Sequence, residues 1–235
     1  MKKFAFLMMG LIAAFTMTAC LDSNSDSDMY EVADFANVTG LAPLTFQTDA
    51  SGMVQVADMD SAVSSYDDYD FGDRMLIYFK KLNDASGQPT NQIKLFGFIK
   101  FQHGEIATLV DGEVNDYGSV DIDLSTSNNY YDLVHVTKEV VDVQVVMKGS
   151  KSEGHDVTLV LDEMNPTTED GFLNLQLCHS APESESSATK YGYMYYTFDM
   201  FEFMPYMDGT KGVQFTAVGL NSKDPVEHKF EWPAN

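Results

Sequence analysis

The sequence is poor in cysteine, in basic residues and in long apolar runs. Of its 235 residues two are cysteine, and 14 Lys and Arg stand against 36 Asp and Glu, which gives a formal net charge of −22. A phosphate backbone would be repelled by such a charge, so we expect no nucleic-acid partner. Two cysteines cannot form a disulfide framework. Stability must therefore come from a packed core, for which 44% hydrophobic residues are sufficient.

Motifs of catalysis and cofactor binding are also missing. The chain contains no GxSxG, HExxH, GxGxxG or Walker motif, and its five histidines show no close-paired spacing. Cys178 could act with a distant histidine as a thiol nucleophile. A small, half-buried residue on a strand is the favoured interpretation of Cys178. We therefore predict no cofactor and no enzymatic activity.

The N-terminus carries the one extended apolar run. Lys2 and Lys3 precede the uncharged segment 4–17, and two small residues lead to Cys20. This pattern predicts a lipoprotein signal peptide over residues 1–19 and a mature chain that begins with acylated Cys20. The alternative is an ordinary signal peptide with a coincidental cysteine. Acyl chains such as palmitate would anchor the protein without a membrane-spanning helix.

Beyond the anchor, the pattern is that of β-strands. Residues 20–30 are acidic and Ser-rich and predict a flexible tether. Later apolar residues alternate with period two and are separated by Gly, Pro, Asn and Asp, which indicates about ten short strands in a sandwich or barrel. Gly97 predicts a bulge, and Pro205 limits segment 200–207 to a helical turn. The alternating sets are Met75/Ile77/Phe79, Val141/Val143/Val145/Met147, Val157/Leu159/Leu161, Leu173/Leu175/Leu177 and Val213/Phe215/Ala217.

The polar stretch 125–129 divides the strand-rich sequence into two parts. It lacks any apolar pattern and lies between two runs of strands. Each part has the length of a small β domain. We therefore predict a domain boundary near residues 125–136, with one domain at 31–128 and a second at 129–235.

Acidic residues in segment 111–123 are weak candidates for a metal site. The segment begins like a calcium loop but lacks the glycine and the final glutamate of an EF-hand. A solvated acidic hairpin is the favoured interpretation. If a cation binds, its ligands would be Asp111, Glu113, Asp116 and Asp121.

Aromatic residues are concentrated near the C-terminal end, in segment 191–206. Tyr191, Tyr193, Tyr195 and Tyr196 are weak candidates for a binding surface, because exposed tyrosines could stack on sugar rings or anchor a protein. Alternation favours a place in the core for one face of this strand. The first three would line one side of it.

Five stretches along the chain carry a family resemblance. They are the leader with Cys20, DFGDRMLIYFKKLND (70–84), IATLVDGE (106–113), VDVQVVMKG with HDVTLVLD (141–162), and GFLNLQLCHSA with YGYMYYTFDM (171–200). Together they resemble the NigD-like lipoproteins of the Bacteroidetes. The resemblance implies an all-β protein, with an N-terminal OB-like β-barrel followed by a C-terminal antiparallel β-sandwich. It implies no enzymatic activity and no catalytic residues.

We therefore expect a lipid-anchored protein of the cell envelope, located at the outer membrane and exposed at the surface. Its expected function is that of a non-catalytic binding or accessory module for an envelope protein or a glycan, and we expect a monomer. An alternative is an immunity or export factor, because the name-giving member of the family is associated with a bacteriocin gene cluster. An uncharacterised hydrolase is a further alternative.

Overall fold

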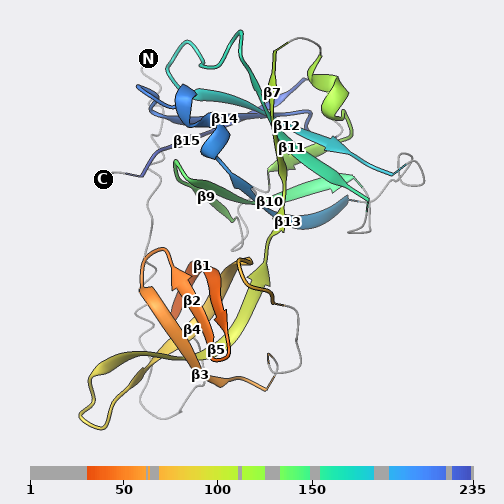
Figure 1. Ribbon diagram of the computed structural model, residues 1–235. Helices are drawn as coiled ribbons and strands as arrows, with labels where there is room; N and C mark the ends of the chain where they lie inside the picture. Colours follow the sequence, from red (N-terminus) through yellow and green to blue (C-terminus); the bar gives the residue numbers. More distant parts are fainter. Residues whose placement is uncertain are drawn as a thin grey trace, which may run out of the picture. The chain divides into compact units, whose positions relative to one another are not determined.

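The N-terminal part of the chain folds as a closed five-stranded barrel in the computed structural model (Figure 1). The structure describes residues 31–61, 63, 69–110, 113–124, 133–148, 154–182, 191–220 and 224–233, so Cys20 and the predicted tether lie outside the described residues. The barrel strands are β1 (Val32–Leu41), β2 (Leu44–Thr48), β3 (Gly52–Met59), β4 (Arg74–Asn83) and β5 (Pro89–Lys100). Their order around the barrel is β1-β2-β3-β5-β4, with β3 parallel to β5. Because β4 returns to pair with β1, this is a Greek-key barrel of the OB type.

The C-terminal part of the chain contains two further sheets. One sheet has the order β6-β13-β10-β8, and β9 pairs with the same strand β10. The other has the order β15-β14-β12-β11-β7. The elements are β6 (Gln102–His103), β7 (Glu105–Leu109), η1 (Val114–Tyr117), β8 (Ile122–Leu124), β9 (Val134–Val136), β10 (Val140–Lys148), β11 (Asp156–Asp162), β12 (Leu173–Ser180), β13 (Tyr191–Asp199), η2 (Phe201–Tyr206), β14 (Gly212–Ala217) and β15 (Val226–Glu231). The prediction of an all-β protein is confirmed.

These sheets are mixed rather than antiparallel, which corrects the prediction. β7 runs parallel to β11, β12 parallel to β14, and β6 parallel to β13. The reason is that the chain alternates between the two sheets. After β12 it crosses to β13 in the other sheet and then returns as β14, so β12 and β14 run in the same direction.

The chain divides between Phe101 and Gln102, about 27 residues before the boundary predicted from the sequence. Segment 102–124 belongs to the C-terminal unit because its strands β6, β7 and β8 pair with β13, β11 and β10. Gly104 lies where the chain leaves one sheet for the other. A Cβ atom there would lie 2.0 Å from the ring of Phe198, so only glycine fits. A boundary near residues 125–136 is thus wrong, because β8 and β9, which precede and follow the polar stretch 125–129 in sequence, both pair with β10 of the C-terminal domain.

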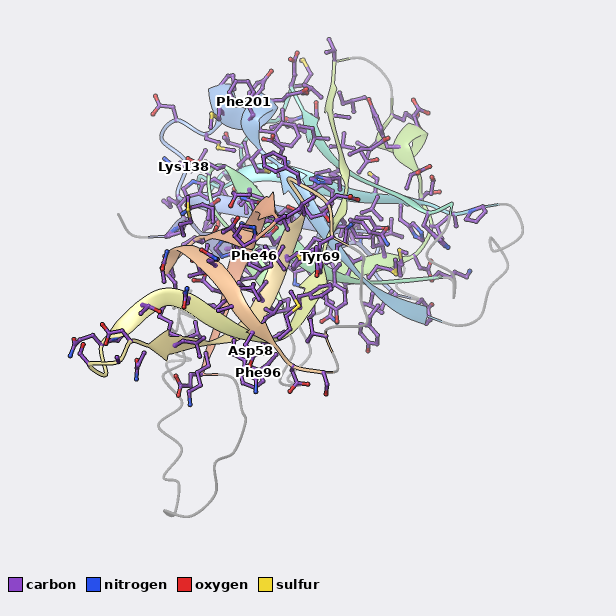
Figure 2. The ribbon with its side chains drawn as sticks, turned by 60° about the horizontal axis from the view of Figure 1, so that its bottom comes forward. Phe46, Asp58, Tyr69, Phe96, Lys138 and Phe201 are labelled. Carbon is purple, nitrogen blue, oxygen red and sulfur yellow. The ribbon has the colours of Figure 1, made fainter. Side chains whose placement is uncertain are left out.

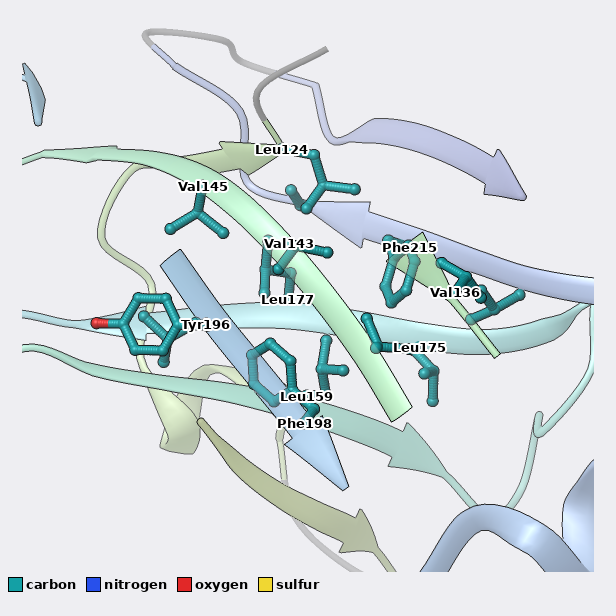
Figure 3. Close-up of a cluster of buried hydrophobic side chains, with 14 of the residues drawn as sticks. Leu124, Val136, Val143, Val145, Leu159, Leu175, Leu177, Tyr196, Phe198 and Phe215 are labelled. Atoms are coloured by element: carbon teal, nitrogen blue, oxygen red, sulfur yellow. The ribbon is translucent and has the colours of Figure 1, made fainter. Parts of the chain in front are cut away.

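Two separate apolar cores follow the predicted alternation. In the barrel, Met75, Ile77 and Phe79 are fully buried. In the C-terminal domain the inward residues of both sheets meet in one cluster, shown in Figure 3. Labelled members of that cluster are Val143, Val145, Tyr196 and Phe198 from one sheet and Leu159, Leu175, Leu177 and Phe215 from the other.

An ion pair between a buried arginine and an exposed aspartate adds to the barrel. Arg74, which is 3% exposed, donates two hydrogen bonds to the carboxylate of Asp49, at 2.9 and 2.6 Å. Its guanidinium group also lies 5.5 Å from the centre of the Phe35 ring. Such a paired charge is costly to break, because the partner that remains would be buried.

Candidate functional site

The tyrosines of β13 divide between the two faces of its sheet. Tyr191, Tyr193 and Tyr195 lie on the outer face, opposite Lys148, Val146 and Gln144 of β10 in the register. Tyr193 is 60% exposed, while its two neighbours are partly buried. We call these three residues the tyrosine face.

Tyr196 does not belong to this surface. It is 2% exposed and lies in the apolar core with Phe198 (Figure 3). Residues 195 and 196 are consecutive on a strand, so their side chains point to opposite faces. Burial raises the pKa of the Tyr196 phenol to about 12. Its inclusion among the binding candidates was therefore wrong.

Hydrogen bonds hold the two outer members of the tyrosine face. Gln144 donates from Nε2 to the Tyr195 hydroxyl at 3.1 Å. Tyr191 donates its hydroxyl proton to Oδ2 of Asp121 at 2.9 Å. Both rings are thus held in place before any ligand arrives, and Tyr193 stands between them. A surface fixed in this way loses little side-chain entropy on binding.

The three predicted cation ligands that the structure describes do not form a metal site. Asp111 lies outside the described residues. The backbone N–H of Glu113, next to η1, donates to the carboxylate of Asp116 at 3.3 Å, while the carboxylate of Asp121 accepts from Tyr191. Across the described ranges, no three His, Cys, Asp or Glu side chains are placed to hold a metal ion. The local hydrogen bonds are those of an acidic loop.

A buried pair of histidines was not anticipated from the sequence. Nδ1 of His155 lies 2.8 Å from Nε2 of His179, and the two rings stack with their centres 5.1 Å apart. His179 is fully buried between the sheets, with its Nδ1 3.3 Å from the carbonyl oxygen of Asp121. The β11–β12 hairpin brings the pair together, because Val157 lies opposite His179. A hairpin centred near Asn165-Pro166 was the one sequence signal that could have found it.

The environment of His179 determines where its proton lies. A carbonyl oxygen can only accept, so Nδ1 of His179 carries the hydrogen and donates it to Asp121. In the neutral ring Nε2 is then the acceptor, and Nδ1 of His155 donates to it. Burial lowers the pKa of His179 to about 4, although the backbone carbonyls of Asp121 and Val120 oppose that shift. At neutral pH His179 is an uncharged structural group with both ring nitrogens in use.

Cys178 points to the opposite face of β12 from His179. Its side chain is 3% exposed, and its Sγ lies 3.9 Å from the carbonyl oxygen of Val114 in η1. A hollow of about 140 Å³ adjoins it, lined by η1, β12 and β14. Burial raises the pKa of the thiol to about 11, so the thiolate needed for nucleophilic attack is not populated at neutral pH.

The described residues also bear on membrane insertion. Among them, no helix has both the length and the apolar character needed to cross a bilayer.

Comparison with known proteins connects the fold to a group of bacterial structures. No protein-family model and no curated protein matches the chain. A protein of unknown function designated DUF1344 from Bacteroides vulgatus aligns with a TM-score of 0.62 at 16% identity, over 86% of this chain and 90% of that one. A candidate lipoprotein from Bacteroides fragilis gives 0.60 at 14% identity, over 86% and 97%. A NigD-like immunity protein from Bacteroides caccae gives 0.55 at 12% identity, over 83% and 90%.

The chain has the NigD-like fold. The resemblance noticed in the sequence is thus confirmed for the architecture, across both domains. Identities of 12–16% establish the fold alone and transfer no activity. For the NigD-like fold, function must be argued from the surfaces of this chain.

Proposed function

We propose that the protein is a cell-envelope lipoprotein, anchored by acyl chains on Cys20, whose tyrosine face binds an uncharged glycan without catalysis. The exposed ring of Tyr193 between two tethered tyrosines is the observation that carries this proposal. In this proposal the acyl chains lie in the outer membrane, and the body of the protein is exposed at the cell surface.

The chemistry of the tyrosine face suits a sugar. Tyrosine offers an apolar ring that can stack on a sugar ring and a hydroxyl that can hydrogen-bond to it. The ammonium of Lys148, opposite Tyr191 on β10, adds a polar group, whereas Gln144 is buried and its Nε2 is already bound to Tyr195. An acidic glycan would be repelled by the net charge of −22, so an uncharged one is favoured.

A non-catalytic function agrees with the state of the reactive groups. The Cys178 thiol is buried and protonated, and the ring nitrogens of His179 are engaged. Neither group belongs to the tyrosine face. A glycan bound there would meet tyrosine and lysine side chains, while the neighbouring carboxylates of Asp121 and Asp123 already lie within hydrogen-bond distance of the Tyr191 hydroxyl and of Nε2 of His228.

Binding can be tested with the mature chain on a panel of neutral polysaccharides, by affinity electrophoresis. We expect retardation by at least one of them, and about tenfold weaker binding for Tyr193→Ala, which matches the 1.4 kcal/mol that one aromatic contact can supply. Phe71→Ala is the matched control, since Phe71 is 73% exposed on the barrel side of the chain. No retardation by any polysaccharide, or equal losses in the two variants, would refute the proposal.

The anchor can be tested separately. Growing cells that carry the wild-type protein or Cys20→Ser are labelled with a fatty-acid probe, and the envelope fraction is analysed. We expect label only in the wild type, because the thiol of Cys20 is the acylation nucleophile. Label in the Cys20→Ser protein would contradict this assignment. Support for the anchor comes from the leader sequence and from the candidate lipoprotein that shares the fold.

An immunity function is the second candidate. It is favoured by the fold shared with the NigD-like immunity protein. A strain that lacks the gene and the same strain with the gene restored can be compared for growth in spent medium from co-resident strains. Selective inhibition of the deletion strain would support this function, and equal growth would count against it.

A further inference from the structure

One end of the C-terminal domain exposes an unusual amount of apolar surface. Eight large apolar side chains are strongly exposed among the described residues, and four of them lie at this end. They are Met164 at 79%, Phe201 at 69%, Val110 at 62% and Met204 at 42%. We call these four residues the apolar end. Exposed apolar residues that gather in this way mark interaction surfaces.

Three segments that are distant in sequence form the apolar end. The backbone N–H of Glu163 donates to the carbonyl oxygen of Leu109 at 3.1 Å, which brings the turn after β11 beside the end of β7. The hydroxyl of Tyr206 in η2 donates to Oε1 of Glu163 at 2.6 Å, which adds η2 to the same surface. Figure 1 shows the end of β7, the β11–β12 turn and η2 at the upper end of the C-terminal domain. Phe201 stands at its outer margin in Figure 2.

Acidic side chains surround these apolar groups. Segments 109–110, 162–164 and 199–206 contain four carboxylates and no Lys or Arg. The carboxylates are those of Asp162, Glu163, Asp199 and Glu202. The neighbouring β9–β10 turn adds one charge of each sign, Lys138 and Glu139, and is joined to η2 by the hydrogen bond from Met200 N–H to the Glu139 carbonyl oxygen.

Two lysines that contact Asp170, in the segment between β11 and β12, already have hydrogen-bond partners. Lys211 donates to the carbonyl oxygen of Asp170 at 2.7 Å, and Lys229 donates to its carboxylate at the same distance. With these two lysines, Lys138, Glu139 and Asp170 included, six carboxylates stand against three ammonium groups. The local charge is negative, as is the charge of the whole chain.

We propose that the apolar end binds a basic amphipathic segment of another protein. Methionine and phenylalanine side chains accept apolar anchors of varied shape, and methionine adapts to them at little cost. The surrounding carboxylates would pair with Lys and Arg on the polar side of the segment. Charge argues against the other occupants. A second copy of this chain would bring its own carboxylates, and a membrane of anionic lipids would be repelled.

The proposal can be tested with the mature chain and a fluorescent model peptide of about 18 residues, made of Leu and Lys in an amphipathic helical pattern. A peptide of the same composition in scrambled order, and an amphipathic peptide of Leu and Glu, are the comparison probes. Fluorescence anisotropy should show binding of the basic amphipathic peptide at least about tenfold tighter than either comparison probe.

Variants then locate the binding surface. Met164→Ser with Phe201→Ser should weaken binding about tenfold or more, whereas Met53→Ser with Phe71→Ser, which removes equally exposed apolar residues elsewhere, should not. Glu163→Gln with Glu202→Gln should weaken binding and reduce its dependence on salt. These changes leave the tyrosine face intact, so failure here is distinct from failure of glycan binding.

Three results would overturn the proposal. The first is equal affinity for the ordered and the scrambled basic peptides, which would show nonspecific attraction by charge. The second is unchanged affinity in the Met164→Ser/Phe201→Ser protein. The third is that the wild-type protein binds phosphatidylcholine vesicles but no peptide, and that the Met164→Ser/Phe201→Ser protein no longer binds the vesicles. That result would assign the apolar end to lipid.

Discussion

Protonation of His179 should destabilise the C-terminal domain as the pH falls below neutrality. In the folded protein, Nδ1 of His179 donates to the carbonyl oxygen of Asp121, and Nε2 accepts from His155. A second proton on the ring would have to displace the His155 hydrogen bond and would place a charge between the sheets. Burial accordingly lowers the pKa of His179 to about 4, from the usual 6.5 of a histidine.

The sign and size of the effect follow from proton linkage. Because the pKa is lower in the folded than in the unfolded state, the unfolded chain binds more protons between pH 6.5 and pH 4. The stability that neutral His179 contributes is therefore fully present above its pKa in the unfolded chain. It is lost as the pH falls toward the pKa of His179 in the folded protein. A shift of this size would cost about 2 kcal/mol at pH 5. Solvent screening reduces this figure, so we expect a loss of about 1–2 kcal/mol.

The single tryptophan provides a selective assay. Trp232 packs against the core of the C-terminal domain and donates to Thr210 at 3.0 Å, so its fluorescence follows the unfolding of that domain. Urea unfolding is measured at pH 7.5 and pH 5.0 for the wild type and for His179→Leu. The variant should be less stable than the wild type at both pH values. Its free energy of unfolding should nevertheless fall by about 1–2 kcal/mol less than that of the wild type on acidification.

A histidine outside the core is the control. His103 lies exposed on β6, so His103→Gln should follow the wild-type pH dependence. Titration of the many carboxylates is common to all three proteins and cancels in their differences. If the wild type and His179→Leu lose the same free energy on acidification, the assignment of an uncharged, buried His179 is wrong.

Three other predictions concern stability and reactivity. Asp49→Asn should destabilise the barrel by about 2–3 kcal/mol, because the Arg74 charge stays buried. Urea unfolding followed by circular dichroism measures this loss. Recovery of stability in Asp49→Asn/Arg74→Met would support this cause, and a further loss would oppose it. Gly118→Ala should lower the free energy of unfolding by about 2 kcal/mol or more, since φ is +114° and a Cβ would lie 2.4 Å from the backbone carbonyl of His179. Gly209→Ala should lower it less, because a Cβ at Gly209 would meet open space. Cys178 should resist a thiol reagent at pH 7.5 until urea unfolds the chain, and rapid labelling of the folded protein would contradict its burial.

Local sequence patterns determined the strands and the faces that they bury. Leu173, Leu175 and Leu177 alternate with polar neighbours, and the structure places all three in the core, because side chains on a strand point to opposite faces in turn. The pairing of β4 with β5 shifts register beside Gly97, as a bulge predicts. Pro205 lies in the short helix η2, as the sequence indicated. These features depend on neighbours along the chain, which is why they could be predicted.

Strand partners were decided only by the tertiary structure. The division after Phe101, the parallel pairing of β12 with β14 and the meeting of His155 with His179 all depend on contacts between distant segments. The apolar end is a further case, since η2 and the β11–β12 turn become neighbours only in the fold. A strand pattern states which face will be buried but not which strand will lie beside it. That choice minimises the exposed surface of the whole domain, and no local pattern in the chain encodes it.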